Sequence, residues 1–127
     1  MKLDHLFRPE KIGKVSIKNR FVRSATAEKM ATQEGYASKR LIKLFSDLAD
    51  GDVGLIITGG LAVTPSSTLT TNAPCIYDDK FIKEQRTLVN RVHENLESKI
   101  CAQIVHTGAQ TGNKKFHPVA PSPIKPD

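Results

Sequence analysis

The order of the apolar segments along the chain constrains its fold more than any other feature. Residues 53–58 and 100–105 are short, largely apolar runs, and residues 21–26 form a shorter run that ends in polar residues. Between these runs, residues 38–50 and 81–95 carry apolar side chains at helical spacing. Because each link between consecutive strands contains a helix, the strands are predicted to be parallel. The sequence therefore predicts an α/β fold with βαβαβ connectivity.

Capping residues mark the ends of the two predicted helices. Ser38 is a candidate N-cap of the first helix and Gly51 follows its last residue. Asp78 or Asp79 can cap the second helix, which is expected to run to about Asn95. The apolar stripes are Leu41, Ile42, Leu44, Phe45, Leu48 and Ala49 in the first helix and Phe81, Ile82, Leu88, Val89, Val92 and Leu96 in the second.

Turn-forming residues predict how the remaining segments connect. A short hairpin or cap is expected at residues 12–17, before the sheet. The strand at 53–58 is expected to open into a loop at Gly59, and residues 64–74 are expected to form a long rim loop. A loop is then expected to run from residue 108 to Asp127, because Pro118, Pro121, Pro123 and Pro126 block regular structure.

The charge balance narrows the class of partner. The chain carries 19 basic and 13 acidic residues, a formal charge of +6. No aromatic residues alternate with the basic ones, as nucleic-acid stacking platforms would require, so a solvated surface is the favoured interpretation. We expect no nucleic-acid or membrane partner and a soluble, cytoplasmic protein, since the N-terminus lacks an apolar targeting segment. The basic stretch consists of Lys11, Lys14, Lys18, Arg20 and Arg23.

Common motifs for metal and nucleotide sites are missing. Cys75 and Cys101 stand 26 positions apart outside any CxxC pattern, and we expect both to be reduced thiols, on a rim loop and a buried strand respectively. The four histidines are scattered without ligand spacing, so no metal site is expected. Neither the dinucleotide-binding glycine pattern nor a Walker A sequence occurs. Tyr36 precedes a helix, and packing is favoured over a role as proton donor.

Gln103 is the most informative single residue, because it lies within the apolar run at 100–105. In a buried strand its amide must find hydrogen-bond partners. A glutamine amide presents a donor and an acceptor side by side, which can pair with the pyrimidine-like edge of a flavin ring. A second interpretation stays open, in which Gln103 bonds to backbone or water inside the fold.

Four segments occur together in an order and spacing that resemble the old yellow enzyme family. They are residues 18–26 (KNRFVRSAT), 53–59 (VGLIITG), 77–79 (YDD) and 103–108 (QIVHTG). The resemblance covers nearly the whole chain. It implies that residues 1–127 are the N-terminal half of an FMN-binding TIM (β/α)8 barrel, about three βα units, and a fragment of a longer chain.

The resemblance also places one flank of an FMN site on this chain. The residues after the first barrel strand would lie along the isoalloxazine ring, mainly through their backbone. Gly60 matches a small residue beside the flavin, although a turn glycine is the alternative. Gln103 matches the amide at the flavin edge. The cofactor-binding residues implied are Ser24, Ala25, Thr26, Ala27, Gly60 and Gln103.

Two positions depart from the family pattern. Ala27 stands where the family often has a Cys, Thr or aromatic side chain, so redox tuning is not inferred. The usual His-x-Gly-Arg segment ends in Ala109 instead of arginine. The family's catalytic residues lie in later βα units, so those of this protein are unknown and expected beyond Asp127.

By resemblance, the full enzyme would pass a hydride from NAD(P)H through FMN to an electron-poor alkene such as an enone, and the isolated chain would be inactive. One alternative is a structural or assembly module without activity, whose strand edges pair with the rest of the barrel or with a second copy. Another FMN barrel family is a further alternative, and the context of Gln103 argues against it.

Overall fold

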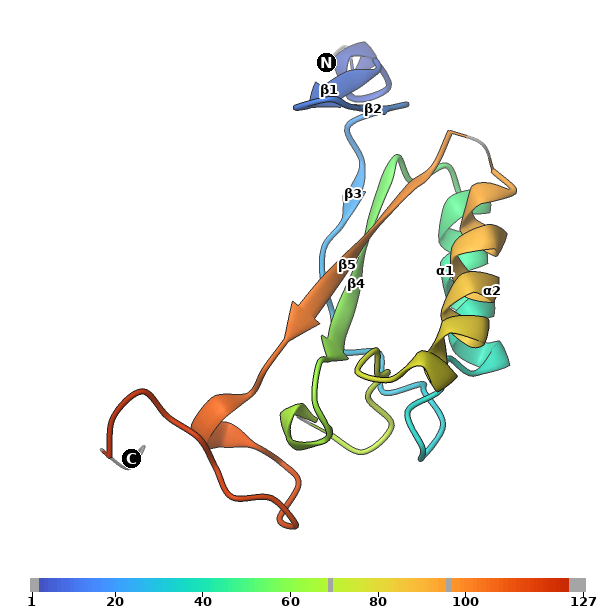
Figure 1. The fold of residues 1–127 in the computed structure, drawn as a ribbon. Helices are drawn as coiled ribbons and strands as arrows, with labels where there is room; N and C mark the ends of the chain where they lie inside the picture. Colours follow the sequence, from blue (N-terminus) through green and yellow to red (C-terminus); the bar gives the residue numbers. More distant parts are fainter. Residues whose placement is uncertain (1–2, 69, 96, 124–127) are drawn as a thin grey trace.

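The structure, a computed structural model, describes residues 3–68, 70–95 and 97–123. Its centre is a three-stranded sheet in the order β3-β4-β5, and both α-helices lie on one side of it (Figure 1). A separate two-stranded hairpin stands at the N-terminal end, and an irregular segment follows β5 at the other (Figure 1). The predicted α/β class is therefore confirmed.

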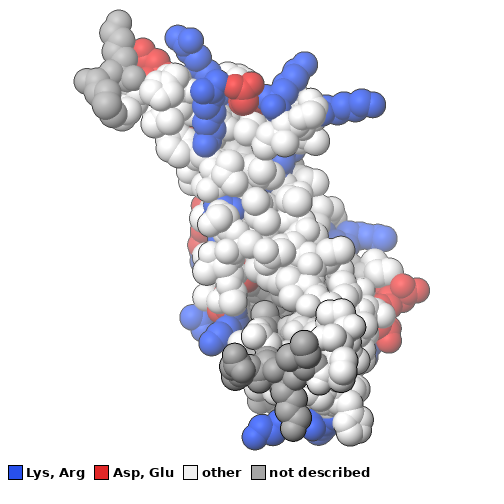
Figure 2. Space-filling view, turned by 90° about the vertical axis from the view of Figure 1, so that its left-hand side faces the viewer, with Lys and Arg blue, Asp and Glu red and all other residues white. Residues whose placement is uncertain are grey.

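The predicted hairpin is confirmed. β1 (Glu10–Ile12) pairs antiparallel with β2 (Val15–Ile17). Gly13 in the turn has φ 60°, a left-handed conformation that glycine adopts without strain. Lysine and arginine side chains project around this end of the molecule (Figure 2). Exposed basic residues there include Arg8, Lys11 and Lys14, as expected for a solvated surface.

The two helices form the core with the sheet. α1 (Lys39–Asp50) begins after Ser38, whose side chain accepts a hydrogen bond from the Leu41 N–H, so the predicted cap is confirmed. α2 (Ile82–His93) follows a 3-10 turn (Asp79–Phe81) that Asp78 caps, and it ends two residues before the expected Asn95. The buried cluster between sheet and helices comprises Ala37, Leu41, Phe45, Ala49, Ile56, Leu88 and Val92.

The predicted apolar stripe of α2 is wrong at one residue, Ile82, and cannot be compared at another, Leu96. Ile82 is 47% exposed, because the preceding 3-10 turn directs Phe81 into the core in its place. Leu96 lies outside the described residues. Tyr36 packs against Phe81 with ring centroids 5.0 Å apart, which confirms the packing role.

The strands are parallel, as predicted. β3 (Val22–Arg23) pairs with β4 (Leu55–Ala62), and β4 pairs with β5 (Lys99–Val105). The expected opening of β4 into a loop at Gly59 is wrong. The strand continues through a bulge to Ala62, because pairing with β5 resumes at Gly60.

β5 is the edge of this sheet, and its exposure contradicts the expected buried strand. Residues 101–104 are exposed, since β4 covers one side of the strand and no described segment covers the other. Cys101 is therefore an exposed thiol, whereas Cys75 on the rim loop is buried, and neither forms a disulfide.

The rim loop and the C-terminal segment are largely irregular, as expected. Short 3-10 turns occur at Pro65–Ser67 and Gly108–Gln110. The loop returns to the sheet through a single bridge between Ala62 and Cys75. Pro126 and Asp127 lie outside the described residues. No helix in the described part of the chain has the length and apolarity needed to cross a membrane.

Candidate functional site

Most of the predicted site residues meet at the C-terminal ends of the strands. Gly60 of β4 pairs directly with Gln103 of β5. Ala27, which follows β3, lines a small cavity of about 30 Å³ together with Gly60 and Val105. The Thr26 carbonyl lies against Gly59, where a Cβ would overlap it. The structure therefore brings together three chain segments that the sequence placed at one site.

A bulge in β4 produces this arrangement. Ile57 pairs with Cys101 and Gly60 with Gln103, so three steps along β4 correspond to two along β5. The extra residue shifts the register from this point to the end of the strand. Without the shift, Gly60 would stand opposite Ile104.

The Thr58 side chain bridges the bulge to β5 by hydrogen bonds. Its hydroxyl accepts a hydrogen bond from the Gln103 N–H at 3.0 Å and donates one to the Gly59 carbonyl at 2.8 Å. The hydroxyl thus satisfies an N–H that the interrupted ladder leaves without a carbonyl partner. Nothing in the apolar run had singled out Thr58.

On the side of the bulge that faces β3, Arg23 and Glu28 form an ion pair. Arg23 Nη2 lies 2.8 Å from Glu28 Oε1, with side chains 17% and 3% exposed. Sequence reasoning missed this pair and placed Arg23 on a solvated surface, which is wrong. A charged residue inside a short strand candidate was the available signal, because such a residue requires a partner when the strand is covered by a helix.

Gln103 is not the buried amide that the sequence suggested. It is exposed, in a part of β5 where residues 101–104 are all exposed. Ile100, three residues earlier, packs against the helix cluster, so Gln103 points to the opposite, helix-free face. Its donor and acceptor are both available to a ligand on that face.

Residues 24–27 form the third side of the site. Ser24, Thr26 and Ala27 are exposed and Ala25 is partly buried. The Thr26 hydroxyl donates a hydrogen bond to the Ser24 carbonyl at 3.3 Å. All four side chains of this segment are small, and three of the four residues are exposed. Such a surface suits contact with a flat ring.

Gly60 lies within β4, so the alternative of a turn glycine is wrong, and its place beside a flavin stays a prediction. A Cβ at this position would lie 2.9 Å from Val105 Cγ2, a distance that real Cβ atoms do not tolerate. The contact that requires glycine within this chain is therefore with β5.

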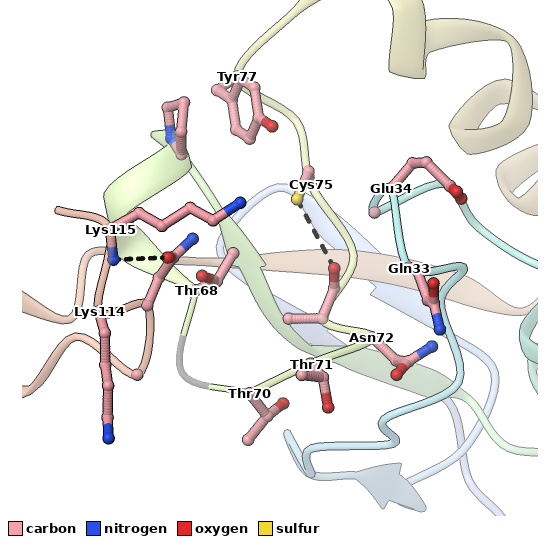
Figure 3. Close-up of a pocket in the computed structure, with 15 residues that line it drawn as sticks. Gln33, Glu34, Thr68, Thr70, Thr71, Asn72, Cys75, Tyr77, Lys114 and Lys115 are labelled. Atoms are coloured by element: carbon pink, nitrogen blue, oxygen red, sulfur yellow. Dashed lines mark hydrogen bonds between the residues drawn. The ribbon is translucent and has the colours of Figure 1, made fainter.

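A larger pocket of about 700 Å³ lies between the rim loop and the C-terminal segment (Figure 3). Figure 3 shows Cys75 and Tyr77 on one side and Lys115 on the other. Burial raises the pKa of the Cys75 thiol, and burial also raises that of Tyr77. The thiol is therefore protonated at neutral pH, and Cys75 is a poor nucleophile.

The segment that departs from the family pattern is ordered by its own contacts. His106 Nδ1 accepts a hydrogen bond from the Gly108 N–H at 3.0 Å, and Gly108 has φ 59°. Ala109 contributes no charge at this position. The described residues hold no group of three or more His, Cys, Asp or Glu side chains suited to a metal ion.

Comparison with known proteins gives a family match over nearly the full length. The model of the NADH:flavin oxidoreductase / NADH oxidase family matches residues 5–126. The NADH oxidase of Thermoanaerobacter brockii is 36% identical over 124 residues, which are 94% of this chain and 19% of that protein. The N,N-dimethylglycine/sarcosine dehydrogenase of Chromohalobacter salexigens is 35% identical over 118 residues, 87% of this chain and 16% of the relative.

Solved structures show the same relationship. The old yellow enzyme of Pichia sp. AKU4542 has a TM-score of 0.78 and 31% identity, and covers 84% of this chain and 28% of its own. The old yellow enzyme homologue of Zymomonas mobilis has a TM-score of 0.85 and 25% identity, with 92% of this chain and 33% of its own covered. The chain thus spans less than a fifth of these two curated relatives and about a third of the solved structures.

Proposed function

We propose, because this chain belongs to the NADH:flavin oxidoreductase / NADH oxidase family, that it forms one flank of the FMN site in an FMN-dependent NAD(P)H oxidoreductase. The acceptor would be an electron-poor alkene such as an enone. In this proposal β3, β4 and β5 are the first three strands of a (β/α)8 barrel, and α1 and α2 lie on its outside. FMN, when bound, would supply the hydride-transfer chemistry.

The observation that carries the proposal is the opposition of Gly60 and Gln103 on the helix-free face. An exposed glutamine amide offers a donor and an acceptor side by side, the complement of a flavin's pyrimidine edge. The residues fit the cofactor, since Gly60, which has no side chain, stands opposite this amide, and Ala27 lines the cavity next to Gly60. Those that would hold FMN are Ser24, Ala25, Thr26, Ala27, Gly60 and Gln103.

The chain's own residues supply positioning but no proton chemistry in this proposal. The exposed backbone after β3 would orient the ring, and Gln103 would fix its edge by hydrogen bonds. The described residues of the site include no general acid or base with free access to that face. The catalytic groups are therefore proposed to lie in the remainder of the barrel.

A chimera tests the proposal. This chain replaces the matching N-terminal segment of the Pichia enzyme, and the product is purified with excess FMN and desalted. We expect retained flavin, visible in the absorption spectrum, and NAD(P)H oxidation that depends on an enone. A folded, monodisperse chimera that carries no flavin would contradict the proposal.

A second candidate function is an assembly module without activity. Its supporting observation is the exposed sheet: Ile104 is 65% exposed, and β3 and β5 each pair with β4 alone in the described chain. Open edges favour pairing with another chain. Light scattering on the purified chain would show discrete oligomers if this function is correct, with no response to FMN.

A further inference from the structure

The buried Arg23–Glu28 pair has no assigned role in the proposed flavin contacts. Its side chains are 17% and 3% exposed. Withdrawing two charges from water carries a large desolvation cost, and apolar residues of similar size often fill such a space at lower cost. The contacts that the pair makes with its surroundings therefore need an explanation.

Those contacts go to the two residues that flank Thr58 in β4. Arg23 Nη1 donates to the Ile57 carbonyl at 2.8 Å. Glu28 Oε1 accepts from the Gly59 N–H at 3.2 Å. The ion pair joins these two bonds, so the last residue of β3 and a residue of the segment that follows it together hold both sides of the bulge.

The surrounding packing fixes the pair in this position. The Arg23 guanidinium carbon lies 5.5 Å from the centre of the Phe45 ring in α1. A Cβ at residue 59 would overlap the Glu28 carboxylate, so Gly59 allows the carboxylate to approach the backbone. The sheet, the helix and the bulge thus meet at one buried ion pair.

We propose that Arg23 and Glu28 are positioning residues that hold the β4 bulge and so set Gly60 opposite Gln103. The flavin part of this inference rests on the proposed function. Loss of the extra residue from the pairing would place Gly60 opposite Ile104 and turn the following side chains to the other face. The ion pair would then act on the flavin flank through the backbone, without touching the ring.

Three variants separate positioning from simple stabilisation. Glu28→Leu leaves the Gly59 N–H and the Arg23 guanidinium without their partner. Arg23→Met combined with Glu28→Leu removes both charges at similar volume, which can restore stability, and it carries the test if Glu28→Leu does not fold. Glu28→Gln keeps an oxygen that can accept both bonds. Glu10→Leu is the matched control, since the Arg20–Glu10 pair is 46% and 48% exposed.

The readouts are made by NMR on the labelled chain without flavin. They are hydrogen exchange at the Gly59 amide and the cross-peak between the Gly60 Hα and the Val105 methyl. In the double variant we expect Gly59 exchange to accelerate about tenfold or more, as loss of one hydrogen bond implies, and the cross-peak to disappear. Glu28→Gln and Glu10→Leu should retain both signals. A folded double variant with unchanged Gly59 exchange and cross-peak would overturn the inference.

FMN titration of the chimera tests the flavin part separately. The FMN dissociation constant should rise about tenfold in the double variant and stay unchanged in Glu28→Gln, in proportion to one lost contact. Equal FMN affinity in all variants would overturn the positioning of the flavin flank while the proposed function stands. The chimera could instead fold without binding flavin while the NMR signals of the variants respond as expected. That result would overturn the proposed function and leave the role of the ion pair in the bulge intact.

Discussion

Gly60 of β4 and Gln103 of β5 stand opposite each other, one residue away from the register that the two strands have at Ile57 and Cys101. This opposition joins two residues that the sequence had related only through a family resemblance. It depends on the bulge and on the absence of a side chain at residue 60, since a Cβ there would lie 2.9 Å from Val105 Cγ2.

Gly60→Ala should destabilise the chain by about 1–3 kcal/mol, the usual cost of overpacking. The added Cβ would contact the Val105 side chain, so Val105→Ala in the same molecule should recover part of the loss. Urea denaturation of the two single variants and the double variant measures the coupling. Strictly additive effects would show that Val105 is not the obstructing group.

The two thiols should differ in reactivity. Cys101 is exposed and Cys75 is buried with a raised pKa caused by that burial. In the native chain, a thiol reagent should modify Cys101 rapidly and Cys75 slowly, and denaturation without reductant should reveal both as free. Cys101→Ser identifies the fast phase. Finding no free thiol after denaturation would contradict the expected reduced state.

The raised pKa of Cys75 predicts a pH dependence of stability. Near and above about pH 8.5, the pKa of an unfolded thiol, the folded state keeps its proton and therefore binds more protons than the unfolded state. The free energy of unfolding should then fall as pH rises towards the higher pKa of the folded thiol. Denaturation of wild type and Cys75→Ala between about pH 7.5 and about pH 10 should show the steeper decline in wild type. Parallel curves would exclude Cys75 as the cause.

Gln103→Leu should weaken FMN binding in the chimera by roughly 1–3 kcal/mol, because the flavin edge would lose its partners. The fold should survive, since Gln103 is exposed in this chain. Gln110→Leu, at another exposed glutamine, serves as the control. Unchanged flavin content, affinity and turnover in Gln103→Leu would remove this residue from the site.

The isolated chain should neither retain FMN tightly nor turn over NAD(P)H. A barrel of this kind binds phosphate at loops after its seventh and eighth strands, which a three-stranded sheet does not contain. Individual hydrogen bonds contribute only about 0.5–1.5 kcal/mol, too little to offset the entropy of association. Desalting after addition of FMN, followed by a spectrum and a rate measurement, tests this. Stoichiometric flavin with turnover would show that the chain is self-sufficient.

Local patterns in the sequence determined the elements and their order. Ser38 predicted the start of α1 because a cap acts within one helical turn, and helical spacing identified Phe45 and Val92 as core residues. The βαβαβ order made the parallel sheet predictable, since a helical crossover returns the next strand in the same direction.

Only the tertiary structure decided the contacts that shape the site. The partner of Arg23, the hydroxyl of Thr58 that replaces a ladder bond and the bulge at Gly59 all depend on strands distant in sequence. The exposure of Gln103 likewise depends on β5 being the edge of the sheet. An apolar run predicts a strand, but strand register and burial arise from the neighbours that pair with it and cover it.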